Sequence, residues 1–512
     1  MKKQEQNTKE TVSMLVYGYL VILFAGLPLY MQNKLVMIGN AKYLFFRNTT
    51  LVLGVFVVLA VLWQRIRGEQ TTKRTWKKTD VFMLLYLVSA IFSYGISPCR
   101  EDVLLGYPGW YMGLVTQGLL VGIYFAVSRY YDGSRSIWWI VGITAGIVTL
   151  IGLLNRLDID VLGTFRGMEN GEWNRTQLLS TIGNNNWYAG YISVTAGISL
   201  AAAFMGKQQV RALGLRGSFL FFASAITSNS TTAILAACGL SLLLLLLSLR
   251  KRGRLLRALE ILMLLPLSVF MVRMFLLLHL TGLVLAGDAE KRLFFTPAWY
   301  VVFVVEVAVY LILQLRERQE RSDRLESGRV FRTVVGLAVA VTLAALLLGC
   351  LLVAGYLPGS DKVSEVANGR LALWKVTILT YGKEGLLFQI FGMGPDSFYY
   401  ALYQWGSDAM DWINRGLLDN NIYSNAHNEW LTLLVQQGIL GVIAYGGIFL
   451  TAFRNLRISA TRDPRALAVF LGLTGYLICS LFTFQHVLST PFAFALLGMA
   501  EGVLCKVILI KF

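Results

Sequence analysis

The chain has 512 residues, of which 56% are hydrophobic and only 15% are charged, and its mean hydropathy is +0.60. Soluble domains carry roughly a quarter charged residues, so this composition excludes an ordinary soluble globular protein. The apolar residues recur in long runs along the whole chain, each with room for a helix that crosses a bilayer. A formal net charge of +17 would suit a nucleic-acid binder, but the placement of the basic residues argues against that class.

The apolar runs predict an all-α polytopic membrane protein with about 12–14 transmembrane helices, built as a single integral membrane domain over 1–512. In chain order the candidate segments are 13–31, 44–63, 80–97, 113–128, 137–154, 186–205, 217–229, 231–248, 258–285, 294–314, 333–357, 429–453, 466–484 and 488–505. The segment 217–229 is the weakest, because it is short. No small-x-small cleavage site follows the first segment, which is therefore expected to remain as an anchor.

The basic residues indicate the orientation of these segments. About two thirds of the 46 Lys and Arg fall in one set of alternate loops, and cytoplasmic loops are the ones that collect such residues. Both termini are therefore expected in the cytoplasm, and the large loop 358–428 outside the cytoplasmic membrane. Because the basic residues are distributed as membrane topology requires and form no single patch, we expect no nucleic-acid partner.

The large loop 358–428 holds the first group of candidate site residues. Arg370 opens an amphipathic segment, where it could bind a substrate anion or reach lipid phosphate. Asp396 stands beside the turn Gly392-Met393-Gly394-Pro395, which either brings backbone close to another group or only separates two elements.

His427 stands at the mouth of the helix that begins near 429, with Asn428 and Glu429 directly after it. It is one of three histidines, and it could act in catalysis or cap the helix. The three histidines lie in three separate segments, and the five cysteines have no metal or disulfide spacing. The sequence therefore predicts no metal site and no cofactor.

A second group of polar residues lies on the outer loop 155–185. Arg166 and Arg175 precede the stretch TIGNNNWYAGY (181–191), which opens the sixth predicted helix. Asparagines at a membrane boundary are costly unless they bind protein or a polar ligand. Asn184 and Asn186 could therefore bind substrate or cap the helix.

Together these motifs resemble the O-antigen ligase and O-antigen polymerase superfamily. GRLALW (369–374), GMGPDSF (392–398) and AHNEWLTLLVQQGILG (426–441) follow one another as in that family, and GNNNWYAGY (183–191) is similar to its Gly-Asn-x-Asn helix start. The resemblance covers roughly 180–450. It implies a metal-independent, inverting membrane glycosyltransferase. Such an enzyme transfers a glycan from an undecaprenyl-pyrophosphate-linked donor to an acceptor on the outer face of the bacterial cytoplasmic membrane.

The resemblance also implies roles for single residues. Arg370 matches the loop arginine that holds the donor pyrophosphate, and His427 matches the essential histidine. Family members carry a second arginine in a Ser-Arg-Gly/Ala stretch, whereas TSNSTTAIL (227–235) has Ser and Thr there. Either Arg175 or Arg166 supplies that charge, or the donor is held differently, or 227–235 is not the counterpart. The stretch 258–350 is longer than the usual core and is interpreted as an insert.

The chemistry of glycan transfer suits these residues. A planar guanidinium can bind two pyrophosphate oxygens, and a histidine can accept the proton of an acceptor hydroxyl near neutral pH. Asp396 or Glu429 would orient the imidazole or the sugar. The acceptor could be a glycan, a lipid or a protein, and membrane lipids surround the chain.

The alternative from another class is a transporter or flippase, for lipid-linked glycan or a small solute. Such a protein needs ionisable residues or broken helices near the membrane midplane. Arg273 and Glu306 are the plain cases of charge inside the apolar segments. Because most polar groups instead fall on the outer loops, the sequence favours an enzyme.

Overall fold

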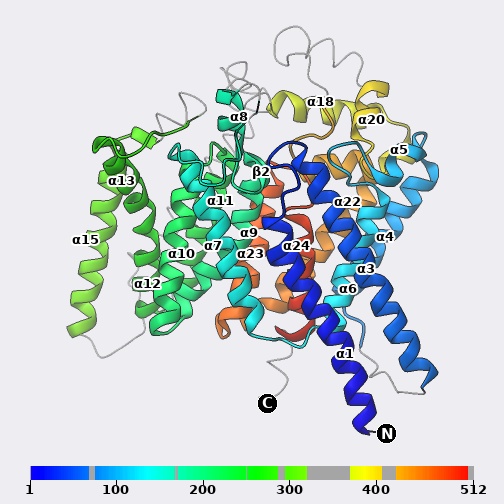
Figure 1. The fold of residues 1–512 in the computed structure, drawn as a ribbon, viewed down its shortest axis with the longest axis horizontal. Helices are drawn as coiled ribbons and strands as arrows, with labels where there is room; N and C mark the ends of the chain where they lie inside the picture. Colours follow the sequence, from blue (N-terminus) through cyan, green and yellow to red (C-terminus); the bar gives the residue numbers. More distant parts are fainter. Residues whose placement is uncertain are drawn as a thin grey trace.

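The computed structural model describes residues 2–67, 75–166, 168, 171–249, 251–285, 294–319, 370–405 and 423–504. These residues form a helical bundle with one short β-hairpin (Figure 1). The all-α polytopic class predicted from the apolar runs is confirmed: ten helices of the described part are long and apolar enough to cross a membrane. The predicted segment 333–357 lies outside the described residues.

The elements of the first half of the chain are α1 (Lys2–Val21), η1 (Ile22–Gly26), α2 (Leu27–Leu29), α3 (Ile38–Ile66), α4 (Lys78–Ile96), α5 (Arg100–Leu105), α6 (Leu114–Tyr130), α7 (Ser136–Arg156), α8 (Gly171–Gln177), β1 (Leu178–Leu179), β2 (Gly183–Asn184), α9 (Asn185–Met205), α10 (Gln208–Thr227) and α11 (Thr231–Ser248). The second half holds α12 (Arg252–Leu262), α13 (Leu264–Leu277), α15 (Ala298–Gln319), α18 (Arg370–Lys383), α19 (Leu386–Phe391), α20 (Phe398–Trp405), α22 (Glu429–Leu456), η2 (Ser459–Thr461), α23 (Pro464–Ser480), α24 (Thr490–Met499) and η3 (Ala500–Leu504).

Two predicted segments differ from the helices that form. The short segment 217–229 belongs to α10, which starts at Gln208, because Arg211 and Arg216 interrupt the apolar run without interrupting the helix. Arg211 forms an ion pair with Glu260 of α12, so its charge is accommodated there. The predicted segment 258–285 is divided at Met263 into α12 and α13.

Helix α9 forms the centre of the bundle, with α10 and α23 beside it (Figure 1). A methyl group on Gly197 would overlap the carbonyl of Ala468, and one on Gly475 would overlap the carbonyl of Ser193. Helices in a bilayer gain stability from close backbone approach at such small residues. The glycines therefore let α9 and α23 approach until their backbones touch, which places the start of α9 at a fixed position.

One end of the bundle gathers the shorter elements. Helices α18 and α20 lie across this end, opposite to the end from which α1 starts (Figure 1). The antiparallel hairpin β1–β2 lies at the same end and leads directly into α9. The first residues of α9, α11 and α22 therefore approach the segments that hold Arg370 and Asp396.

Candidate functional site

Arg370 and Asn186, from opposite halves of the chain, meet at this end of the bundle. Arg370 is the first residue of α18, and its Nη2 donates a hydrogen bond of 3.4 Å to Oδ1 of Asn186. The same oxygen accepts a hydrogen bond of 3.1 Å from Oγ of Ser230. Burial lowers the pKa of Arg370 from its usual value, although the guanidinium remains charged near neutral pH. A mostly buried cation is thus held between the starts of α9 and α11.

The first turns of α9 and α11 are fixed by asparagine side chains. Asn184 caps α9, since its Oδ1 accepts a hydrogen bond of 2.8 Å from the backbone N–H of Asn186. Asn185 Nδ2 donates to the carbonyl of Asn229 at 3.0 Å, which joins α9 to the residues before α11. The capping interpretation is therefore confirmed for Asn184, whereas substrate binding by this stretch stays a prediction. Helix N-termini carry partial positive charge, so these two add to the charge of Arg370.

His427 lies close enough to Arg370 for their charges to interact. Burial first, and the positive charge of Arg370 second, lower the pKa of His427 from 6.5 to about 4. Its Nδ1 is buried without a hydrogen-bond partner among the described residues, and its ring packs edge-on to Phe484 at 5.4 Å. The backbone of His427 has a φ of 48°, and its N–H donates to Oδ1 of Asn425 at 3.0 Å. The imidazole is therefore neutral at pH 7, with one nitrogen available as a base.

The two residues after His427 serve the start of α22. Asn428 caps the helix through a 3.0 Å hydrogen bond from the N–H of Leu431, and its Nδ2 donates to the carbonyl of Leu481 at 3.0 Å. Glu429 is buried and accepts hydrogen bonds from the hydroxyls of Tyr445 and Tyr476. Both residues thus have protein partners that fix the segment before α22.

Asp396 joins the glycine turn to the segment between α5 and α6. Its Oδ2 accepts hydrogen bonds from the backbone N–H groups of Tyr107 at 2.7 Å and Met112 at 3.0 Å. Burial raises the pKa of this carboxyl to about 6, while the two backbone hydrogen bonds oppose that rise. Asp396 therefore positions the 107–112 segment.

The glycine turn itself packs against α22. Gly394 donates its N–H to the carbonyl of Gln436 at 2.9 Å, and a methyl group on Gly392 would overlap the backbone of the same residue. Gly438 interrupts α22 with a φ of 64°, and a methyl group there would overlap the carbonyl of Ile390. The close backbone partner that the sequence left open is thus the kinked part of α22.

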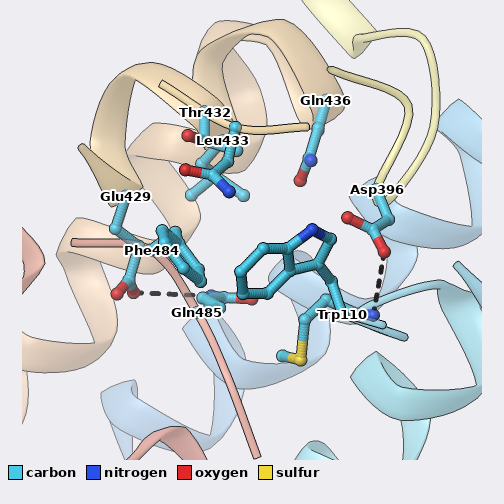
Figure 2. Close-up of a pocket in the computed structure, with 10 residues that line it drawn as sticks. Trp110, Asp396, Glu429, Thr432, Leu433, Gln436, Phe484 and Gln485 are labelled. Carbon is cyan, nitrogen blue, oxygen red and sulfur yellow. Dashed lines mark hydrogen bonds between the residues drawn. The ribbon is translucent and has the colours of Figure 1, made fainter. Parts of the chain in front are cut away.

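A small pocket, partly open to the outside, lies beside these residues (Figure 2). In Figure 2 the indole of Trp110 projects between Glu429 and Phe484 on one side and Asp396 on the other. The complete lining is Trp110, Met112, Asp396, Asn425, Glu429, Thr432, Leu433, Gln436, Phe484 and Gln485. It combines aromatic walls with hydroxyl, amide and carboxyl groups, a combination typical of sites that bind small polar ligands.

Aromatic rings connect this cavity to the start of α9. Trp110 packs edge-on against both Phe484, at 4.6 Å, and Trp187, at 5.6 Å. Trp187 in turn stacks on His486 at 6.0 Å. His486 Nδ1 accepts the N–H of Leu488, so its Nε2 carries the proton and donates to Ser489. His486 therefore serves packing. The sequence analysis did not identify Trp110, Trp187 and Phe484, because they lie on three separate segments of the chain.

Arg166 and Arg175 occupy a more exposed position. Arg166 is exposed, and Arg175 forms an ion pair with Asp158, both side chains being roughly half exposed. Neither arginine contacts Arg370 or His427 in the described part of the structure. Their predicted role as the second arginine therefore stays a prediction. Its test is therefore a functional one.

Arg156, which no motif in the sequence singled out, is completely buried. Its guanidinium donates to the carbonyls of Arg175, of Thr176 at 3.0 Å and of Ser228 at 3.0 Å. It thereby ties the loop before α9 to the turn between α10 and α11. The signal in the sequence was a cation in the last turn of an apolar helix, a place where arginine usually reaches outward.

Arg273 and Glu306 are only partly buried, and the structure shows completely buried charges on other helices. Lys42 is fully buried and donates to the carbonyls of Leu27 and Pro28 at 2.7 and 2.8 Å. Asp80 pairs with Arg129 at 3.1 Å. The spanning helices thus hold charges beyond those two, and Lys42 and Asp80 bind protein partners, as expected for charges that stabilise a bundle.

Comparison with known proteins identifies one region of the chain. Residues 293–446 match the family model described as O-Antigen ligase. The matched residues are less than a third of the chain. The match contains Arg370, Asp396 and His427, and it ends within α22, before α23 and α24. No curated protein matches the chain.

The matched family comprises glycosyl-transferring proteins of surface polysaccharide synthesis, a role that includes both ligases and polymerases. This assignment agrees with the resemblance in the sequence and with the multi-pass helical bundle. The chain is therefore a polytopic membrane protein that carries an O-antigen ligase family domain at residues 293–446.

Proposed function

We propose that the protein transfers a glycan from an undecaprenyl-pyrophosphate-linked donor to an acceptor hydroxyl at the outer face of the bacterial cytoplasmic membrane. The observation that carries the proposal is the meeting of Arg370, Asn186 and His427, which come from segments far apart in the chain. The family match supplies the reaction class, and a cation lies within electrostatic range of a neutral histidine.

In the proposed reaction the acceptor oxygen attacks the anomeric carbon of the donor. His427 takes the hydroxyl proton while the bond from this carbon to the pyrophosphate oxygen breaks, and the electron pair leaves with the pyrophosphate. Attack from the face opposite the leaving group inverts the anomeric centre. A positioned general base contributes typically about 10²–10⁴-fold to such a step.

Arg370 is proposed to neutralise the leaving pyrophosphate. Its guanidinium is planar and can bind two oxygens at once, and the N-termini of α9 and α11 lie at the same place. These helix starts offer a second source of positive potential where TSNSTTAIL lacks the family's arginine. Donor binding would thus rely on one guanidinium and two helix starts, of which that of α9 is capped by Asn184 and presents Asn186.

The cavity beside Trp110 is proposed to hold part of the glycan. Phe484 forms both its wall and the contact with His427, so a sugar there would lie next to the base. The carboxyls of Asp396 and Glu429 and the amides of Gln436 and Gln485 can accept hydrogen bonds from sugar hydroxyls.

We also propose that 180–450 forms the catalytic core with 258–350 as an insert. In this arrangement both termini lie in the cytoplasm, and the end of the bundle with α18 faces outward. The acceptor is a glycan, a lipid or a protein, and the choice separates a polymerase from a ligase.

The test uses a deletion strain and its lipid-linked intermediates. Single lipid-linked repeats in the deletion strain indicate a polymerase, and full-length polymer held on the lipid indicates a ligase. His427→Ala and Arg370→Ala should each fail to restore the surface polysaccharide, whereas Arg370→Lys should restore part of it. The matched control is His279→Ala, since His279 is exposed and lies outside the site. An unchanged polysaccharide profile in the deletion strain would overturn the proposal and favour a transporter.

Purified protein in liposomes gives the second readout, with the lipid-linked intermediate from the deletion strain as the donor. Loss of Arg370 removes the positive charge that would stabilise the leaving pyrophosphate. Comparable anion-stabilising groups contribute about 10²–10³-fold in rate. Near-normal transfer by His427→Ala would contradict the base assignment.

A further inference from the structure

Helix α18 has two different faces, and the outward one is apolar at its centre. Its inner face packs on a small core through residues such as Leu373 and Val376. On the outer face Ile378 is 55% exposed and Leu379 is 48% exposed. The exposed positions of the helix recur three and four residues apart, at Lys375, Ile378, Leu379, Gly382 and Lys383. This stripe, with a lysine at each end, is typical of a helix that lies on a membrane surface.

Helix α19 continues this surface after a short turn. Leu386 is 71% exposed and Leu387 is 50% exposed. Tyr381 donates its hydroxyl to the carbonyl of Gln389 at 2.8 Å, and Gln389 Nε2 donates back to the carbonyls of Tyr381 at 3.2 Å and Glu384 at 2.9 Å. The two helices are thus fastened into one unit, the α18–α19 hairpin.

We define the hairpin patch as Ile378, Leu379, Leu386 and Leu387. None of these residues belongs to a helix long enough to span the membrane. Soluble surfaces expose large aliphatic residues mostly as scattered single residues, so four of them on ten residues of chain require a partner.

The hairpin adjoins the lipid-facing side of the bundle. Phe391, at the end of α19, packs on Phe92 of α4 with ring centroids 4.3 Å apart. Helix α4 is a candidate membrane span, and Val88, Ile91 and Phe92 on it are 59%, 51% and 44% exposed. Side chains of a spanning helix that are exposed in this way face acyl chains. The hairpin therefore begins where the lipid-facing surface of α4 ends.

A buried carboxyl at the turn of the hairpin agrees with an apolar surrounding. Glu384 is only 3% exposed, and neither carboxyl oxygen has a hydrogen-bond partner within the described part of the chain. Burial raises its pKa to about 8, so the group is mostly protonated at pH 7. A neutral carboxyl costs far less at a bilayer boundary than an ionised one.

We propose that the α18–α19 hairpin is embedded in the adjacent leaflet of the bilayer, with the hairpin patch among the acyl chains and Lys375 and Lys383 at headgroup level. The partner is the lipid surface itself, because the patch is continuous with the lipid-facing side of α4. The hairpin is thus an interfacial anchor within the segment that the sequence assigned to one extracytoplasmic loop.

The anchor has a consequence for Arg370, and this part rests on the proposed function. Arg370 begins the same helix and lies about 12 Å along its axis from Ile378, at about 1.5 Å per residue. Helix α18 runs across the end of the bundle (Figure 1), so anchoring its central part would also limit how far Arg370 can move from the membrane boundary. Anchoring would hold the guanidinium at the level of lipid phosphates, where the pyrophosphate of a lipid-linked donor also lies.

The membrane contact is tested without any substrate, by spin labels in full-length protein in liposomes of phosphatidylethanolamine and phosphatidylglycerol. Four of the five cysteines are replaced by serine, and Cys479 is retained because it is buried. Single labels are placed at Leu386→Cys and Leu387→Cys, with Val88→Cys as the lipid reference and Arg135→Cys, on an exposed loop, as the water reference. Collision rates with oxygen, which concentrates in acyl chains, and with a water-soluble nickel chelate are measured for each label.

The proposal expects the labels on α19 to resemble Val88, with high oxygen access and low nickel access. Labels that match Arg135 would overturn it. Ile378→Cys and Leu379→Cys provide an independent pair of labels on α18. High nickel access at all four positions would refute the membrane anchor. Because no donor or acceptor is present, a failure here leaves the proposed transfer reaction intact. Conversely, an inactive protein whose labels lie in lipid would count against the reaction alone.

Discussion

Asn186 and Arg370 are joined by a hydrogen bond between Oδ1 of Asn186 and Nη2 of Arg370, 3.4 Å long. The two residues lie in the first turn of α9 and at the start of α18, so this contact connects the bundle centre to the O-antigen ligase domain. Ser230 donates to the same oxygen, which fixes the amide between two helix starts. Asn186 therefore orients the arginine that we propose binds pyrophosphate.

Substitution at Asn186 should change donor binding more than turnover. Asn186→Ala removes a long hydrogen bond to a charged group, so the KM for the donor should rise about fivefold; well-formed bonds of this kind contribute ~1.5–3 kcal/mol. Asn186→Asp places a carboxylate against Arg370, which competes with pyrophosphate, and should raise the KM further, by more than about tenfold. Steady-state kinetics in liposomes measures both, and a donor KM for Asn186→Asp equal to that of the wild type would refute this role.

The acidity of His427 should appear in the pH dependence of transfer. Its lowered pKa, about 4, keeps the imidazole neutral and able to accept a proton as the pH falls from 7 toward that value. The acid limb of kcat/KM should therefore lie near pH 4, well below the usual histidine value of about 6.5. Arg370→Gln removes the positive charge and should raise the pKa of His427, although burial, the larger cause, remains.

The same pKa can be read directly by NMR of the protein labelled at histidine. The chain has three histidines, so His427→Asn identifies the resonance of interest and His279→Asn serves as its matched control. A titration of His427 at about 6.5 in the wild type would contradict the buried position described here.

Arg156 should be needed for stability rather than for chemistry. Arg156→Met leaves three carbonyls without their donor in a buried site, and each such loss costs about 1–3 kcal/mol. The free energy of unfolding should therefore fall by at least ~3 kcal/mol, and by less for Arg156→Lys, whose ammonium can still donate. Thermal unfolding in detergent measures the difference. Arg175→Ala is the control, since its ion pair is half exposed and contributes about 0–1 kcal/mol.

The kink in α22 should depend on Gly438. Gly438→Ala forces a side chain into a left-handed backbone conformation and against the carbonyl of Ile390, so the domain should lose roughly 2 kcal/mol or more of stability. Gly385→Ala is the matched control, because its φ is −61° and no atom lies within 4 Å of the new methyl. Equal melting temperatures for the two variants would show that the turn at Gly392–Gly394 tolerates separation from α22.

The sequence by itself determined the class of the molecule. Long apolar runs can satisfy their backbone groups in a bilayer only as helices, so the all-α polytopic class and the approximate position of most spans followed from the apolar pattern. The local motifs around Arg370 and His427 also sufficed to indicate the family, since Gly turns, helix caps and a histidine beside a helix start are short-range patterns.

Only the tertiary structure decided which of these groups meet. The contact of Arg370 with Asn186, the use of Arg156 as an internal donor and the packing of the glycine turn on Gly438 all join segments far apart in the chain. Such contacts depend on how close helices approach, which small residues such as Gly197 and Gly475 set through backbone contact. Spacing along a chain does not encode that distance. The aromatic wall of the cavity likewise arises from three separate segments and became visible only once the helices were packed.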